Sequence, residues 1–153
     1  MRFLFVDRIL ALEPGKSVEA ERVFPASEDF FQDHFPGFPV VPGVLLTEMM
    51  GQAAAKCLDA EGREKGRGKP MLAQIRSASF REWVRPDERI LIKAEIKTSR
   101  DDYATASCTA EVRGCRACAA DLLFTFLPAD KFDPGTRDEV LEAFLASREK
   151  GRG

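Results

Sequence analysis

The segment from Gly43 to Leu58 has almost no polar side when it is drawn as a helix, and this constrains the fold more than any other feature. Its apolar residues occupy every turn: Val44, Leu45, Leu46, Met49, Met50, Ala53, Ala54, Ala55, Cys57 and Leu58. A helix that is apolar nearly all round is a buried one. The rest of the chain is therefore expected to surround it.

Strands are predicted to cover this central helix. Apolar and polar side chains alternate in residues 90–96 and 104–112, a period of two that buries one face of a strand. Residues 61–70 are expected to form a loop. The expected strands are residues 3–12, 17–24, 71–80, 88–99, 103–112 and 115–127. Short turns make them largely antiparallel, so we predict an α+β fold with a curved sheet around the central helix.

Composition and charge exclude several classes of protein. The chain has 153 residues and a formal net charge of −2, which gives no electrostatic footprint for nucleic acid. No apolar run approaches the ~20 residues of a membrane-spanning helix, and charges near the N-terminus are unlike a signal peptide. The four cysteines are expected to be reduced, small apolar residues of a cytoplasmic protein. Cys115 and Cys118 face opposite sides of an expected strand, which argues against zinc.

The only histidine, His34, lies in a segment stiffened by Pro36, Pro39 and Pro42. Proline fixes φ and removes a backbone donor, so this loop is expected to be rigid. Histidine is the side chain whose ordinary pKa is nearest neutrality, and a fixed imidazole beside a carboxylate is a plausible acid–base site. The candidate carboxylate is Glu48, the first charged residue of the central helix.

The start of the central helix completes this candidate site. Gly43 opens the helix, where unpaired N–H groups carry positive partial charge and could bind a developing oxyanion. Glu48 follows ~7.5 Å along the axis, and Gln52 lies one turn further on the same face. A carboxylate on a buried helix is costly unless it is partnered or protonated.

At these residues the chain resembles the β-hydroxyacyl-acyl-carrier-protein dehydratases of bacterial fatty acid synthesis. Their hallmark reads approximately HFPxxPxxPGVLxxExxxQ, and this chain matches its spacing from His34 to Gln52. The resemblance extends to residues 3–10 and 78–86, and it covers residues 3–127 in total.

The resemblance implies a hot-dog fold for residues 1–127, a curved antiparallel sheet wrapped around a long central helix. Residues 128–153 are expected to form a helical tail that packs on it, with a helix over 137–150 that docks through Val140, Leu141, Phe144 and Leu145. The implied activity is that of a hydro-lyase, which converts (3R)-hydroxyacyl-acyl carrier protein thioesters to trans-2-enoyl thioesters for fatty acids or related lipids and polyketides. The implied partners are acyl carrier protein and further copies of the chain, as a homodimer or a trimer of dimers, without metal or cofactor.

Family roles transfer to the matching positions. His34 resembles the base that removes the C2 proton, and Glu48 resembles the acid that assists departure of the C3 hydroxyl. The N–H groups of Gly43 and Val44 resemble the donors to the thioester carbonyl, and Gln52 resembles the residue that orients the acid. In the family, the histidine and the acid meet across a homodimer interface. The candidates to line the apolar acyl tunnel are Phe35, Phe38, Met49 and Phe80.

Some residues depart from the family pattern. Asp33 replaces the glycine that usually precedes the histidine, and Met49 and Gly51 differ around the acid, which leaves the acyl chain length and the pathway open. The isomerising branch of the family usually has aspartate at the position of Glu48, so plain dehydration is favoured. A thioesterase on the same fold and a non-catalytic acyl-binding subunit remain alternatives.

Overall fold

The computed structural model describes residues 1–133 and 137–151. Within these ranges, the elements in chain order are β1 (Arg8–Glu13), β2 (Ser17–Val23), η1 (Asp29–Gln32), α1 (Gly43–Lys65), β3 (Lys69–Phe80), β4 (Arg89–Ser99), β5 (Tyr103–Val112), β6 (Cys115–Leu127), η2 (Ala129–Lys131) and α2 (Glu139–Lys150). Neither α-helix in the described part is long and apolar enough to cross a membrane.

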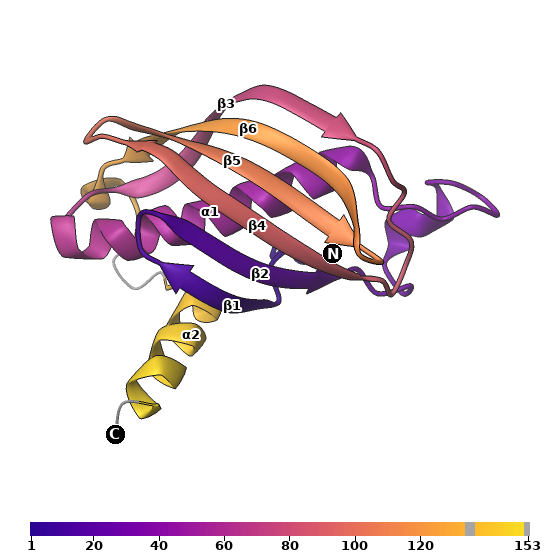
Figure 1. The fold of residues 1–153 in the computed structure, drawn as a ribbon, viewed down its shortest axis with the longest axis horizontal. Coiled ribbons are helices and arrows are strands. Elements are labelled where there is room, and N and C mark those ends of the chain that lie inside the picture. The colour runs from indigo at the N-terminus through magenta and orange to yellow at the C-terminus, as the bar shows by residue number, and fades with distance from the viewer. Residues whose placement is uncertain (134–136, 152–153) are drawn as a thin grey trace.

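The strands form one antiparallel sheet in the order β1-β2-β4-β5-β6-β3. Figure 1 shows this sheet curving around α1. Small buried side chains on β5, such as Ala106 and Cys108, let the helix approach the sheet closely. The Cys108 thiol consequently lies 3.8 Å from the Met50 carbonyl oxygen of α1. This is the predicted hot-dog architecture.

The central helix is longer than the sequence predicts. The prediction of a loop over 61–70 is wrong at both ends, because α1 continues to Lys65 and β3 begins at Lys69. The segment predicted as a loop contains Gly62, and glycine disfavours helix. The helix instead ends at Gly66, which has a left-handed φ of +66° and donates its N–H to the Gly62 carbonyl.

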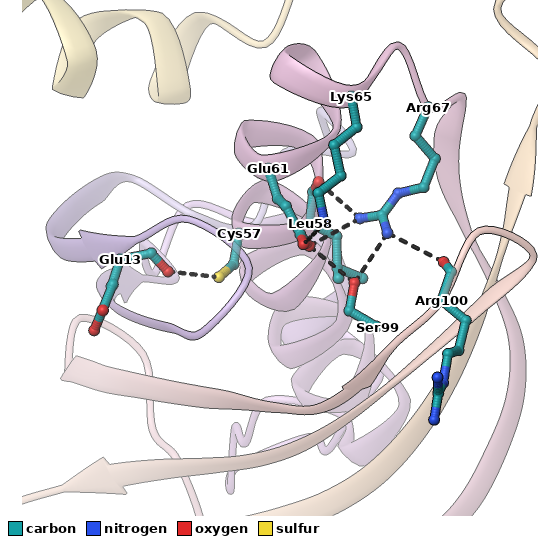
Figure 2. A network of polar contacts seen from close by, with 8 residues as sticks. All are labelled: Glu13, Cys57, Leu58, Glu61, Lys65, Arg67, Ser99 and Arg100. Atoms are coloured by element: carbon teal, nitrogen blue, oxygen red, sulfur yellow. Dashed lines mark hydrogen bonds and ion pairs between the residues drawn. The ribbon is translucent and has the colours of Figure 1, made fainter.

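A polar network holds the C-terminal end of α1 to the β4–β5 hairpin (Figure 2). The Arg67 guanidinium donates to Ser99 Oγ at 2.9 Å and to the Leu58 carbonyl at 3.3 Å, and it pairs with Glu61 at 3.1 Å. Burial opposes ionisation of Glu61, but hydrogen bonds from Lys65 and Ser99 and the nearby charges hold its pKa below the ordinary value. The network therefore stays ionised near neutral pH and fixes the helix end.

The first strand is shorter than predicted. β1 begins at Arg8, so the expectation of a strand over 3–12 is wrong for its first five residues. Asp7 N–H still bonds the Glu21 carbonyl at 2.9 Å, but Phe5 N–H donates to the Gln52 side chain of α1 at 2.8 Å. A backbone group satisfied by a side chain needs no neighbouring strand.

The C-terminal helix α2 docks beside β1 (Figure 1). Asp138 caps its start, because one carboxylate oxygen accepts from the N–H groups of Val140 and Leu141 at 3.1 and 3.0 Å. The other oxygen lies 2.6 Å from Nζ of Lys56 on α1. Leu141 is fully buried, and Val140, Phe144 and Leu145 are partly buried against the core, so this face of α2 is covered.

The burial of each cysteine thiol depends on which face of its strand or helix it occupies. Burial raises the pKa of Cys57 and Cys118 to about 11 and that of Cys108 to about 12, so these groups stay protonated near neutral pH. Cys115 is exposed whereas Cys118 is buried, as strand alternation predicts. All four thiols are free.

Candidate active site

His34 lies in a closed loop between η1 and α1. Its carbonyl accepts a hydrogen bond from Val40 N–H at 3.0 Å. Inside the loop, Phe35 and Phe38 exchange two backbone hydrogen bonds of 3.0 and 2.9 Å, and Gly37, with φ of +78°, makes the turn between them. The His34–Val40 hydrogen bond closes the loop and the Phe35–Phe38 hydrogen bonds hold its interior, in agreement with the rigidity that its prolines predict.

One ring nitrogen of His34 is engaged by the loop itself. Nδ1 lies 3.0 Å from the Val40 carbonyl oxygen. Because a carbonyl can only accept, Nδ1 carries the hydrogen, and in the neutral ring the lone pair lies on Nε2. The Phe35 ring stacks on the imidazole with centroids 4.1 Å apart. The arrangement orients His34 to accept a proton at Nε2.

The N-terminus of α1 presents backbone donors beside an aromatic ring. The first helical hydrogen bonds run to the Pro42 carbonyl, beginning with Leu45 N–H at 3.0 Å. The N–H groups of Gly43 and Val44 precede this hydrogen-bonded part of the helix. A Cβ added to Gly43 would lie 3.2 Å from the Phe80 ring of β3, so any other residue would require that ring to move by a few tenths of an ångström. Only the tertiary structure supplies this reason for the glycine.

Glu48 is half-buried on α1 and is held by Gln52, one turn along the helix. Gln52 Nε2 donates to Glu48 Oε1 and to the Phe3 carbonyl, both at 3.2 Å, and its Oε1 accepts from Phe5 N–H at 2.8 Å. The spacing predicts the contact between the two side chains. The contribution of residues 3–5 has no local sequence signal, because the contact spans 47 residues of chain.

Two of the predicted residues, His34 and Glu48, are not hydrogen-bonded to each other in the part of the chain that the structure describes. In the described residues, the hydrogen bonds of the His34 ring and the Glu48 carboxylate go to Val40 and Gln52, and none joins one to the other. Among the described residues, the edge strand β3 pairs with β6 alone. It ends at Phe80, whose ring lies beside Gly43 at the start of α1. Its residues 71–80 are all exposed and include four large apolar side chains: Met71, Leu72, Ile75 and Phe80.

The residues predicted to line an acyl tunnel divide into two groups. Phe35, Phe38 and Phe80 are exposed near the loop and the start of α1. Met49 is instead fully buried in the core, because its helix position lies on the inner side of α1. Trp83 was not predicted as a site residue, yet it packs edge-on against Phe38 with centroids 5.0 Å apart. Its only signal was its place in the family-like patch at 78–86.

The site residues lie within a region shared with known proteins. A FabA-like domain matches residues 1–121, so the chain belongs to the FabA-like family. Among its relatives, the 3-hydroxyacyl-[acyl-carrier-protein] dehydratase FabZ of Levilactobacillus brevis is 39% identical over 127 residues, which cover 83% of this chain and 85% of that protein. FabZ of Lactiplantibacillus plantarum is 40% identical over 122 residues, covering 79% and 82%.

Solved structures share the fold at much lower identity. The dehydratase heterocomplex ApeI:P from Xenorhabdus doucetiae has a TM-score of 0.66 at 12% identity, over 94% of this chain and 90% of that one. A hypothetical thioesterase with coenzyme A from Streptococcus pneumoniae TIGR4 has a TM-score of 0.62 at 13% identity, over 79% and 85%. These likenesses show the hot-dog fold alone, on which different activities are built.

Proposed function

We propose that this protein removes water from (3R)-3-hydroxyacyl thioesters carried on acyl carrier protein, and so forms trans-2-enoyl thioesters. The observation that carries the proposal is the loop-fixed imidazole of His34, with Nε2 as its free acceptor. It precedes a helix that bears Glu48 and Gln52 in direct contact. The relatives at 39–40% identity are named as dehydratases of such substrates.

The proposed reaction uses each group once. His34 Nε2 takes the proton from C2, and the electrons of that C–H bond form the C2=C3 double bond. Glu48 delivers a proton to the C3 hydroxyl, which leaves as water with the electrons of the C3–O bond. The N–H groups of Gly43 and Val44 stabilise the negative charge that develops on the thioester oxygen. Gln52 orients Glu48 through the 3.2 Å hydrogen bond.

We infer that a second copy of the chain completes this site. An exposed apolar edge strand is a ready template for pairing with another chain, and β3 has this character along residues 71–80. Pairing of β3 with its counterpart would cover Ile75 and Phe80, and the base of one copy could meet the acid of the other. Light scattering tests this inference: a dimer or a multiple of dimers supports it, and a monodisperse 17.0 kDa species overturns it.

The direct test of the activity follows the interconversion of 3-hydroxybutyryl- and crotonyl-acyl carrier protein by the ultraviolet absorbance of the enoyl thioester. We expect conversion by the wild-type protein and a loss of about 10²-fold or more in His34→Ala, the usual scale for a lost general base. Lys131→Ala, at an exposed position of η2, is the matched control and should retain activity. Substrate binding without interconversion would favour the non-catalytic acyl-binding alternative, and release of free carrier thiol would favour a thioesterase.

A further inference from the structure

The side-chain amide of Gln52 is held in one orientation by the backbone that precedes β1. Its Oε1 accepts a hydrogen bond from Phe5 N–H at 2.8 Å, and its Nε2 donates to the Phe3 carbonyl at 3.2 Å. A backbone N–H can only donate and a backbone carbonyl can only accept, so a flipped amide would face two groups of its own kind. The second hydrogen of Nε2 is therefore directed at Glu48 Oε1, 3.2 Å away.

This hydrogen bond distinguishes the two oxygens of the Glu48 carboxyl group. It favours Oε1 as the carbonyl oxygen of the protonated acid, because a hydroxyl hydrogen there would crowd the amide hydrogen of Gln52. The acid proton of the proposed reaction then belongs to Oε2. As that proton leaves, the hydrogen bond to Oε1 becomes a bond to an anion and strengthens.

The segment that makes these contacts lies before the sheet and is clamped to β2 at Asp7. One carboxylate oxygen of Asp7 accepts from Arg22 Nη1 at 2.7 Å, and the other accepts from Val23 N–H at 2.7 Å. The Arg22 side chain is only 11% exposed, and its guanidinium lies 4.5 Å from the centre of the Phe24 ring and 5.8 Å from that of Phe5. The clamp and the aromatic rings therefore form one packed unit.

We propose that Asp7 is a positioning residue of the dehydratase: through residues 3–5 it keeps Gln52 donating to Glu48, and so it keeps the acid proton on Oε2. The inference rests on the proposed function. The fully buried Phe5 ring anchors the segment in the core, and the Asp7 clamp fixes the backbone on either side of β2 contact. A donor that acts mainly on the developing carboxylate stabilises the transition state, so its loss lowers kcat and leaves KM.

The test is a double-mutant cycle between Asp7 and Gln52, measured as kcat and KM for 3-hydroxybutyryl-acyl carrier protein. Asp7→Ala should lower kcat about tenfold, the scale of one hydrogen bond to a charged group, and should leave KM within about twofold. Gln52→Ala should lower kcat by at least as much. If Asp7 acts through Gln52, adding Asp7→Ala to Gln52→Ala lowers kcat no further.

Arg8→Ala is the matched control at the next residue. The Arg8 guanidinium pairs with Glu21 of β2 at 2.9 Å, so it joins the same two parts of the chain as the clamp. Arg8 lies within β1, whose backbone ladder to β2 remains, and Glu21 keeps its ion pair with Arg89 at 2.5 Å. We expect kcat of Arg8→Ala within about twofold of the wild type.

Asp7→Asn decides the matter if Asp7→Ala fails to fold. Asparagine has the same size but keeps only one acceptor oxygen, and its NH2 group faces a donor. Its kcat should fall about threefold in the wild-type background and not at all beside Gln52→Ala.

Amide hydrogen exchange at Phe5 tests the same contacts without substrate. Exchange of this N–H should be faster in Asp7→Ala than in the wild type and unchanged in Arg8→Ala, because only the first variant loosens the segment around its acceptor. Unchanged exchange in Asp7→Ala overturns the inference.

The kinetic outcomes are equally distinct. The inference is overturned by an unchanged kcat in Asp7→Ala, by an equal fall in Arg8→Ala, or by an Asp7→Ala effect of the same size with and without Gln52. The last result would mean that Asp7 serves stability alone. If the wild type converts no substrate, the proposed function itself fails and the inference falls with it.

Discussion

Lys56→Met alone tests how firmly the C-terminal helix is joined to the central one. The substitution leaves Asp138 as a carboxylate without its counter-ion, at a side chain only 13% exposed. Removing one partner of a buried ion pair costs ~3–5 kcal/mol. Asp138 retains its hydrogen bonds from Val140 and Leu141, so we expect the low end, about 3 kcal/mol of unfolding free energy.

This loss converts into a measurable change of melting temperature. In a chain of 153 residues, each kcal/mol shifts Tm by about 3 °C, so Lys56→Met should melt about 9 °C below the wild type. Arg63→Met breaks the more exposed pair with Glu142 and should cost ~0.2–1 kcal/mol, less than about 3 °C. Both variants replace a basic residue of α1 by methionine, and they differ in the burial of the ion pair that is lost.

Differential scanning calorimetry at neutral pH provides the assay. All variants must be compared at one protein concentration, since association raises the apparent Tm. A shift in Lys56→Met no larger than that in Arg63→Met would refute the reasoning, because it would mean that the buried carboxylate tolerates the loss of its counter-ion.

Three further predictions concern the site and its support. Glu48→Gln should fold with an unchanged or higher Tm but lose about 10²-fold or more in turnover; a stable and fully active variant would reduce Glu48 to a scaffold residue. Gly43→Ala should lower turnover with little change in Tm, because the new Cβ lies 3.2 Å from the Phe80 ring, which is exposed and can shift by a few tenths of an ångström away from the start of α1; unchanged turnover contradicts this. The lowered folded-state pKa of Asp138 means that its contribution is complete above the ordinary value of 3.8 and is lost as pH falls through the folded-state value. The Tm gap between wild type and Lys56→Met should therefore close in strong acid, and a gap that persists there would show that another group is responsible.

The parts of the fold that the sequence predicts are those with local causes. β5 and β6 have the predicted bounds, because alternation of side chains is readable within each strand. The end of α1 was not readable, since Gly62 disfavours a helix that the Arg67 network nevertheless holds from outside. Residues 3–7 carry a strand-like composition, but Gln52 takes the hydrogen bonds of Phe3 and Phe5.

The same division applies to the candidate site. The sequence by itself determined the rigid loop around His34, the helix that follows it and the one-turn spacing of Glu48 and Gln52, because prolines and helical periodicity act between near neighbours. Only the tertiary structure decided which groups meet these residues. Gln52 reaches Phe5 across 47 positions and Lys56 reaches Asp138 across 82. Such pairs depend on how separate elements pack around one core, and no local pattern encodes that packing.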